Sequence, residues 1–171
     1  MTNPLPSTTQ LVIPPTFTVD GALPPGRHLS DVDGVRTRLV EPFPASSTRR
    51  SLYDAWRVRR QTLFGIVQVE MEWVNGSFVT AKHAPNDIDV TTFITDDNMA
   101  AVSVDQRQAV WDLTAGPAPQ QVGCHSFLVI VFPDNHPYRV AYLQQRGYWD
   151  DWWSRRRTGQ EKGYIDVRGQ A

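Results

Sequence analysis

The chain has 171 residues, 40% of them hydrophobic and six of them tryptophan, and a formal net charge of −1. A chain of this length and composition is expected to form one globular domain with a substantial core. The near-zero charge excludes a general attraction to nucleic acid, so an RNA partner would need a local basic patch.

The single cysteine and the lack of long apolar runs indicate in which cellular compartment the protein is expected. Cys124 is the only cysteine. It therefore forms no internal disulfide, and we interpret it as a small buried residue in a cytoplasmic protein. The N-terminus lacks the basic start and apolar stretch of a signal peptide. No stretch is long enough to span a membrane, so we expect no membrane partner.

The first residues predict an arm that precedes the domain. Residues 1–20 are rich in Pro and Thr, which disfavours a helix and favours an extended segment. We therefore divide the chain into this arm and a single domain of residues 21–171. Residues 23–26 predict a turn, and residues 28–44 predict irregular structure with a short helix around 30–36.

The next segment predicts an arginine-rich helix. Apolar residues recur at helical spacing from a cap among residues 46–48 as far as Phe64. Arginines crowd the other faces of this helix: Arg49, Arg50, Arg57, Arg59 and Arg60. They form either a solvated basic face or a patch that binds the phosphates of a nucleotide or of RNA.

Three segments in the middle of the chain predict strands. Residues 66–74 alternate between apolar and polar side chains, which is the pattern of a half-buried strand. Residues 88–94 predict a second strand after a loop that Pro85 closes. The apolar run at residues 126–132 predicts a central strand that is buried on both faces.

Two helices and a last strand complete the pattern. Residues 98–113 and 137–154 predict helices, and residues 164–168 predict a short final strand. The order is helix, strand, strand, helix, strand, helix, strand. It predicts an α+β domain in which helices flank a mixed β-sheet.

The acidic pair Asp87 and Asp89 is the strongest candidate for a site. Alternate residues of a strand share a face, so both carboxylates point the same way while Ile88 points into the core. Asp is depleted within strands, and neighbouring carboxylates repel each other unless a cation joins them. Beside the small-residue turn Gly76-Ser77, the pair predicts a site for Mg²⁺ that carries a nucleoside triphosphate.

This arrangement resembles the signature of the DNA polymerase beta-type nucleotidyltransferase superfamily, in which a hydrophobic-Gly-Ser turn precedes an Asp-x-Asp strand. The chain is most similar to a small bacterial nucleotidyltransferase-like branch. That branch has an LPPG-type start, a GSFVT-x-K turn, a P-x-DIDV strand and a Trp-rich segment ending in a Lys-Gly strand. Here these are residues 23–26, 76–82, 85–90 and 148–167. The likeness covers residues 21–168 and implies a minimal nucleotidyltransferase-like fold.

The resemblance implies roles for single residues. Backbone N–H groups and the hydroxyl of the Gly76-Ser77 turn would hold the triphosphate. Asp87 and Asp89 would bind two metal ions, Mg²⁺ or Mn²⁺, and a third carboxylate would help to activate the acceptor. Lys82 either contacts the triphosphate as a point charge or is an exposed loop lysine.

The third carboxylate is ambiguous in this sequence. The superfamily topology would most simply place it on the strand at residues 126–132, where Ser126 stands beside His125 and no acid is present. Asp134 follows that strand. Asp166 lies in a later strand-like run, and we choose it, although the pattern also fits an outward-facing acid of an edge strand. Without a third acid the protein would bind a nucleotide and not transfer it.

Two further clusters have two interpretations each. The aromatic residues between 148 and 153 either stack on a base or pack in the core. The run Arg155-Arg156-Arg157 is either solvated or binds phosphates.

The leading hypothesis is an Mg²⁺-dependent nucleotidyltransferase that moves a nucleoside monophosphate from an NTP to a hydroxyl of RNA, such as tRNA, or of a protein. The small size fits a toxin–antitoxin or phage-defence setting, with a cognate toxin or antitoxin as partner. The oligomeric state, a homo-oligomer included, is left open. A second hypothesis is a catalytically degenerate nucleotidyltransferase fold that acts as a binding or regulatory module. A third is RNA binding through the arginine-rich helix.

Overall fold

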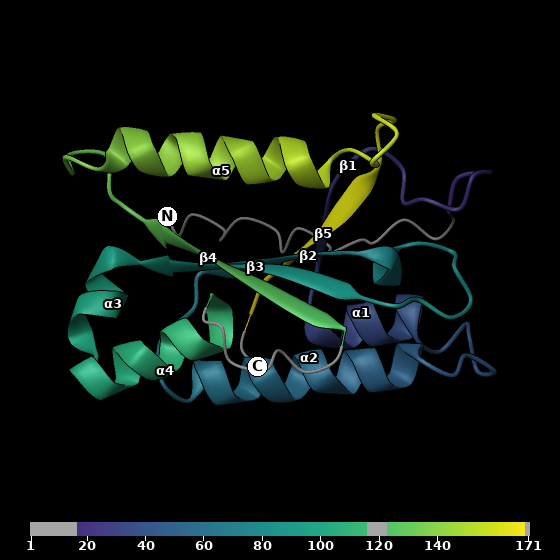
Figure 1. Ribbon diagram of the computed structural model, residues 1–171, viewed down its shortest axis with the longest axis horizontal. Helices are drawn as coiled ribbons and strands as arrows, with labels where there is room; N and C mark the ends of the chain where they lie inside the picture. The colour runs from purple at the N-terminus through teal and green to yellow at the C-terminus, as the bar shows by residue number, and fades with distance from the viewer. Residues whose placement is uncertain (1–16, 116–122, 170–171) are drawn as a thin grey trace, which may run out of the picture.

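A five-stranded mixed sheet lies at the centre of the fold (Figure 1). The structure is a computed structural model that describes residues 17–115 and 123–169. Most of the predicted arm therefore lies outside the described residues. In spatial order the strands are β1 (Gly26–Ser30), β5 (Gly163–Val167), β2 (Met71–Asn75), β3 (Ile88–Thr95) and β4 (Cys124–Val131). β1 is parallel to β5 and β3 is parallel to β4, whereas β2 is antiparallel to both of its neighbours.

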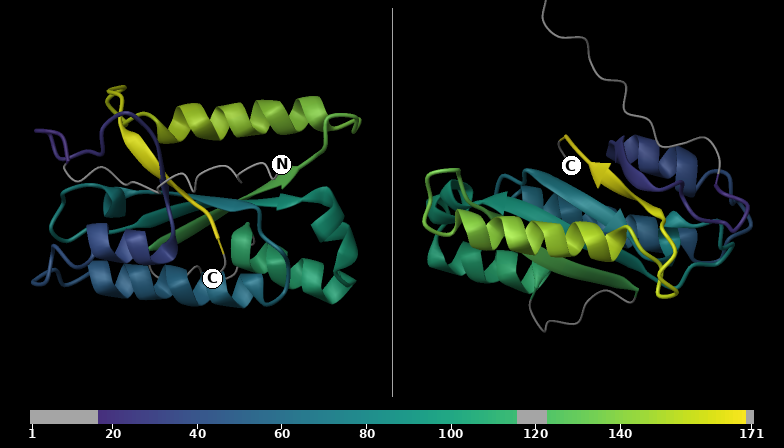
Figure 2. Two further views of the ribbon diagram at one scale, coloured as in Figure 1. Left: turned by 180° about the vertical axis from the view of Figure 1, so that it is seen from behind. Right: turned by 90° about the horizontal axis from the view of Figure 1, so that it is seen from above.

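Helices cover both faces of this sheet, which confirms the predicted α+β class. They are α1 (Val32–Leu39), α2 (Arg49–Phe64), α3 (Asp96–Ala101), α4 (Val104–Thr114) and α5 (Arg139–Trp153), with a short 3₁₀ helix, η1 (Ser77–Val79). α1, α2 and α4 lie on one side of the sheet and α5 covers the other (Figures 1 and 2). Among the described residues, no helix is both long and apolar enough to cross a membrane.

The alternation of β3 divides the core between these two sides. Ile88 and Val90 join Trp56 of α2 in one buried cluster. Phe93 joins Trp153 of α5 in another. Successive side chains alternate across a strand, so the odd-numbered positions of β3 face α5. The acidic pair lies on this less covered side of the sheet.

The strand predicted as central is an edge strand. Within the part of the chain that the structure describes, β4 pairs with β3 alone, and several of its residues stay partly exposed. Both faces of β4 do meet helices, because Phe127 packs with the α5 cluster and Leu128 with the cluster under α4. The apolar run at residues 126–132 therefore reflects helices packed on both faces of β4. It does not indicate how many strands lie beside β4.

Three other elements differ from the prediction. The strand expected from residue 66 begins at Met71, because Ile66 and Val67 still bond to the Leu63 carbonyl at the end of α2. The helix expected at residues 98–113 is broken into α3 and α4, because Ser103 starts a new helix with a capping box. β1 was expected to be irregular, and it becomes a strand through its pairing with β5, which is distant in sequence.

The predicted basic face of α2 is largely buried. Arg59 and Arg60 reach the carboxylate of Glu72, with Nη1 to Oε distances of 2.8 and 2.7 Å. This ion pairing buries β2 on both faces instead of one, and Glu72 has no exposed surface. Arg49 is buried as well. The arginines of α2 that remain exposed are Arg50 and Arg57.

Candidate functional site

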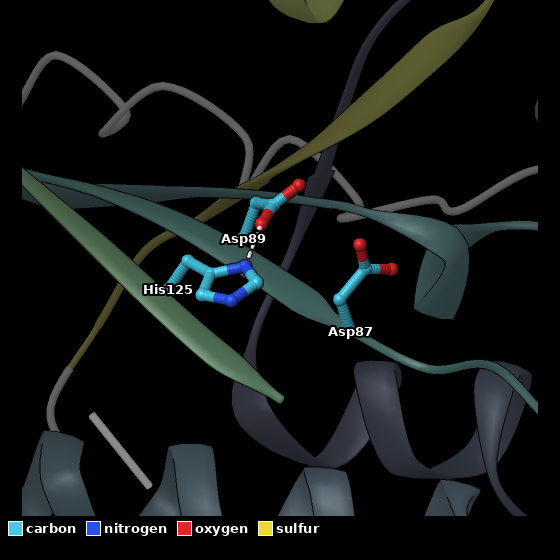
Figure 3. Close-up of side chains that lie close together, drawn as sticks. All are labelled: Asp87, Asp89 and His125. Atoms are coloured by element: carbon cyan, nitrogen blue, oxygen red, sulfur yellow. Dashed lines mark hydrogen bonds and ion pairs between the residues drawn. The ribbon is translucent and has the colours of Figure 1, made fainter. Parts of the chain in front are cut away.

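The candidate site lies where β2, β3 and β4 come together at one end of the sheet. In register, Asp89 of β3 stands between Asn75 of β2 and His125 of β4. Side chains of residues that pair in register share a face, and Figure 3 shows Asp87, Asp89 and His125 on the same side. His125 Nδ1 is 2.9 Å from Asp89 Oδ1. One ligand atom from each of the three residues lies within 4.8 Å of the others, and the described residues form no other such group.

The Gly76-Ser77 turn packs directly against the acidic strand. Gly76 has a φ of 82°, and a Cβ there would lie 2.8 Å from the Asp87 carbonyl oxygen and 3.0 Å from the Asp89 nitrogen. Glycine is therefore required both for the conformation and for the close approach. Asn75, just before the turn, accepts the Gly76 N–H through Oδ1 at 2.9 Å.

Ser77 is hydrogen-bonded to Asp87, the first residue of the acidic pair. Its backbone N–H and its hydroxyl both donate to Oδ1 of Asp87, at 2.7 and 2.5 Å. The hydroxyl oxygen accepts the N–H of Asn86 at 2.9 Å. The turn thus fixes the orientation of the Asp87 carboxylate, and the donors predicted to hold phosphate are already in use.

The two carboxylates have opposite pKa shifts. Burial raises the pKa of Asp87, but the two hydrogen bonds from Ser77 outweigh it and leave this pKa below its usual value. Burial raises the pKa of Asp89, and the charge of Asp87 adds to this, so the hydrogen bond from His125 only partly offsets the rise. Asp89 therefore has the most to gain from a nearby cation.

Lys162 is a site residue that the sequence motifs do not indicate. Its ammonium group donates to Oδ1 of Asn75, whose Nδ2 donates to the Trp153 carbonyl at 2.9 Å. Burial lowers the pKa of Lys162, and the charge of Asp89 partly opposes this. The available signal was the Lys-Gly step that starts the last strand in the family resemblance. Lys162 supplies a fixed positive charge beside the acidic pair.

Lys82 lies nearby but is less constrained. Its side chain is exposed, and its charge contributes to lowering the pKa of Asp87. Among the described residues, no hydrogen bond holds its ammonium group. Arg49 holds the loop that carries Lys82. Its guanidinium donates to the carbonyls of four residues, namely Leu39, Phe78, Thr80 and Lys82.

Neither acid considered as a third carboxylate joins the group. Asp166 is buried opposite Trp73, and both of its oxygens bond to Arg168, at 2.7 and 2.9 Å. Asp134 follows the far end of β4 and pairs with Arg139 at 2.7 Å. The position on β4 beside Asp89 is taken by His125, because strand alternation turns Ser126 to the other face.

The aromatic residues of α5 divide between core and surface. Trp153 is buried and donates through Nε1 to Thr91 Oγ1 at 2.7 Å, while Trp149 packs against Phe127. Tyr148 and Trp152 are 56% and 57% exposed and stack on each other. The core-packing interpretation therefore holds for Trp149 and Trp153, and stacking on a base stays a prediction for Tyr148 and Trp152.

The comparisons with known proteins give a family and no named relative. No curated protein and no solved structure matches the chain significantly. The model of one protein family matches residues 15–168, which include every element described above. The chain therefore belongs to DUF6932, a family of unknown function.

Proposed function

We propose that this protein binds a nucleoside triphosphate through a divalent cation at Asp87 and Asp89 and transfers the nucleotidyl group to a hydroxyl of RNA or protein. The observation that carries the proposal is the convergence of these two carboxylates beside the Gly76-Ser77 turn at one end of the sheet. A bound cation would polarise the phosphate and offset the charge of the leaving group. The finer assignments, a nucleotidyltransferase-like fold and a toxin–antitoxin or phage-defence setting, belong to this proposal.

Asp87 and Asp89 each have one carboxylate oxygen that can bind a cation. Ser77 occupies Oδ1 of Asp87 and His125 contacts Oδ1 of Asp89. Among the described residues, no donor bonds to Oδ2 of either carboxylate. Carboxylate oxygens are the ligands that hard divalent cations prefer in proteins. The pair can therefore accept a cation without breaking its present hydrogen bonds to Ser77.

Two lysines provide positive charge for the phosphates of the substrate. Lys162 is held in place by Asn75, and Lys82 stands on the loop that Arg49 anchors. Their charges act on Asp89 and Asp87 respectively. In this arrangement Lys162 orients a bound polyphosphate from a fixed position, and Lys82 can follow it.

The test is a transfer assay. The full chain is incubated with Mg²⁺ or Mn²⁺, each NTP labelled at its α-phosphate, and total RNA and protein from a bacterial extract. We expect label on a macromolecule with the wild type and none with the Asp87→Asn/Asp89→Asn double variant. Asp97→Asn, which changes an exposed acid of α3, is the matched control. No transfer from any NTP would contradict the proposal.

A second candidate function is a nucleotide-binding or regulatory module without turnover. It is favoured by the lack of a third carboxylate in the group and by the engagement of both Ser77 donors. It predicts binding of a protein or RNA partner that survives the double substitution. Partner capture by the double variant, combined with no transfer by the wild type, would identify this function.

A further inference from the structure

We propose that this site holds one transition-metal cation, with His125 as a direct ligand beside Asp87 and Asp89, in preference to a pair of Mg²⁺ ions. This inference rests on the placement of the metal in the proposed function. The family resemblance implied two ions on three carboxylates. The described residues instead bring together two carboxylates and one imidazole.

The spacing of the ligand atoms suits an octahedral ion. Two ligands at right angles, each about 2.1 Å from such an ion, lie about 3.0 Å apart. The present distance between His125 Nδ1 and Asp89 Oδ1 is 2.9 Å. Metal binding displaces the proton between ligand atoms, so one hydrogen bond is exchanged for two bonds to the same ion. One ligand atom of Asp87 lies within 4.8 Å of those of Asp89 and His125, and Ser77 holds the Asp87 carboxylate in place.

The imidazole changes which ion is preferred. Mg²⁺ favours oxygen ligands and keeps much of its water, whereas imidazole nitrogen binds first-row transition metals well. His125 therefore adds affinity for a transition metal and little for Mg²⁺. It is about half exposed, so its ring is accessible to an incoming ion.

The charges around the site favour one ion over two. Asp87 and Asp89 together carry two negative charges, and the Lys162 ammonium already acts on Asp89. The remaining acids considered for the site are paired elsewhere, Asp166 with Arg168 and Asp134 with Arg139. A second divalent ion would find no carboxylate of its own, and Lys162 supplies the second positive centre instead.

The test measures metal binding without nucleotide or acceptor. The full chain is stripped with a chelator and titrated with Mn²⁺, and free Mn²⁺ is followed by electron paramagnetic resonance, with Mg²⁺ as competitor. We expect one Mn²⁺ per chain and a nitrogen coupling on the bound ion in pulsed spectra. His125→Ala should remove the coupling and weaken Mn²⁺ binding about tenfold or more, with a much smaller effect on Mg²⁺. His83→Ala, which changes an exposed loop histidine, is the control.

A further variant reverses the preference. His125→Asp restores a third carboxylate, so it should strengthen Mg²⁺ binding relative to Mn²⁺ and allow a second ion. Two Mn²⁺ per wild-type chain, or no nitrogen coupling, would overturn the inference. Nucleotidyl transfer with Mg²⁺ in that case would leave the proposed function standing. Conversely, a nitrogen-coupled single Mn²⁺ without any transfer would support the inference and contradict the proposed function.

Discussion

Ser77 donates both its backbone N–H and its hydroxyl to the same carboxylate oxygen of Asp87. This double hydrogen bond connects the glycine-serine turn to the acidic strand, and it keeps Asp87 ionised in spite of partial burial. The turn is therefore a support for the first carboxylate of the site before any ligand arrives.

Replacing Ser77 should change the ionisation of Asp87. In Ser77→Ala the hydroxyl donor is lost and the backbone donor remains, so we expect the pKa of Asp87 to rise. Carboxyl carbon chemical shifts followed against pH measure this value directly. Ser51→Ala is the control, because the exposed Ser51 hydroxyl donates to the Thr48 carbonyl and has no other side-chain hydrogen bond among the described residues. An unchanged pKa of Asp87 would show that the hydroxyl bond is unimportant.

The close packing of the turn predicts a large effect of Gly76→Ala. Both Gly76 and Gly159 have positive φ, 82° and 85°, but a Cβ at Gly159 meets nothing within 4 Å. Gly159→Ala thus reports the conformational strain alone, about 1 kcal/mol. Gly76→Ala adds the clash with Asp87 and should cost about 2 kcal/mol more. Urea unfolding of the two variants gives the difference, and equal losses would contradict the contact.

The buried ion pairs of β2 predict a strong and pH-dependent contribution to stability. Removing the charge in Glu72→Gln leaves Arg59 and Arg60 buried without a counter-ion, which should destabilise the fold by about 3–5 kcal/mol. Its neighbour Glu70 is exposed, so Glu70→Gln should have little effect. Chemical unfolding at neutral pH compares the two.

The pH dependence of the stability takes its sign from the direction in which the pKa of Glu72 is shifted. Burial opposes ionisation, but the charges of Arg59 and Arg60 outweigh it and lower the pKa of Glu72 below its ordinary 4.5. The contribution is therefore fully present above pH 4.5 and is lost as the pH falls through the folded-state pKa. Wild-type stability should drop in this acidic range, and the drop should be smaller in Glu72→Gln. Equal slopes would show that another group titrates.

Arg49 connects the core to the loop at the site through hydrogen bonds, so we expect its replacement to affect both. Its buried guanidinium donates to four backbone carbonyls, three of them between Phe78 and Lys82. Arg49→Lys keeps a charge but cannot supply this set of donors. We expect faster amide exchange in residues 80–82 and a loss of about 3 kcal/mol in unfolding free energy. Arg50→Lys, next along the chain and largely exposed, should change neither.

Local signals in the sequence predicted much of this arrangement. The 3.6-residue pattern of α2 and the alternation around Asp87 and Asp89 depend on neighbouring residues, so they were readable. β1 and the edge position of β4 depend on pairing with distant strands, which leaves no local pattern. The arginines of α2 looked exposed because their partner Glu72 lies on another element.

The parts of the site that are close in sequence were predicted, and the parts that depend on long-range strand pairing were not. The Gly-Ser turn and the acidic pair are close in sequence and were found together. His125 and Lys162 were not chosen, since they reach the site only through the pairing of β4 with β3 and the position of β5 beside β2. The resemblance also implied a third acid, and the imidazole of His125 stands on β4 in register with Asp89.

The candidate site is complete only when β3 and β4 are paired, because Asp89 and His125 come from these two parallel strands. Asp89 lies in β3, which begins directly after Asp87, and His125 lies in β4. These two strands are joined through α3 and α4, and among the described residues β4 pairs with no strand other than β3. A ligand that requires Asp89 and His125 together can bind only after β4 has docked. Such a ligand would stabilise the edge of the sheet, because it binds only the state in which β4 is paired with β3.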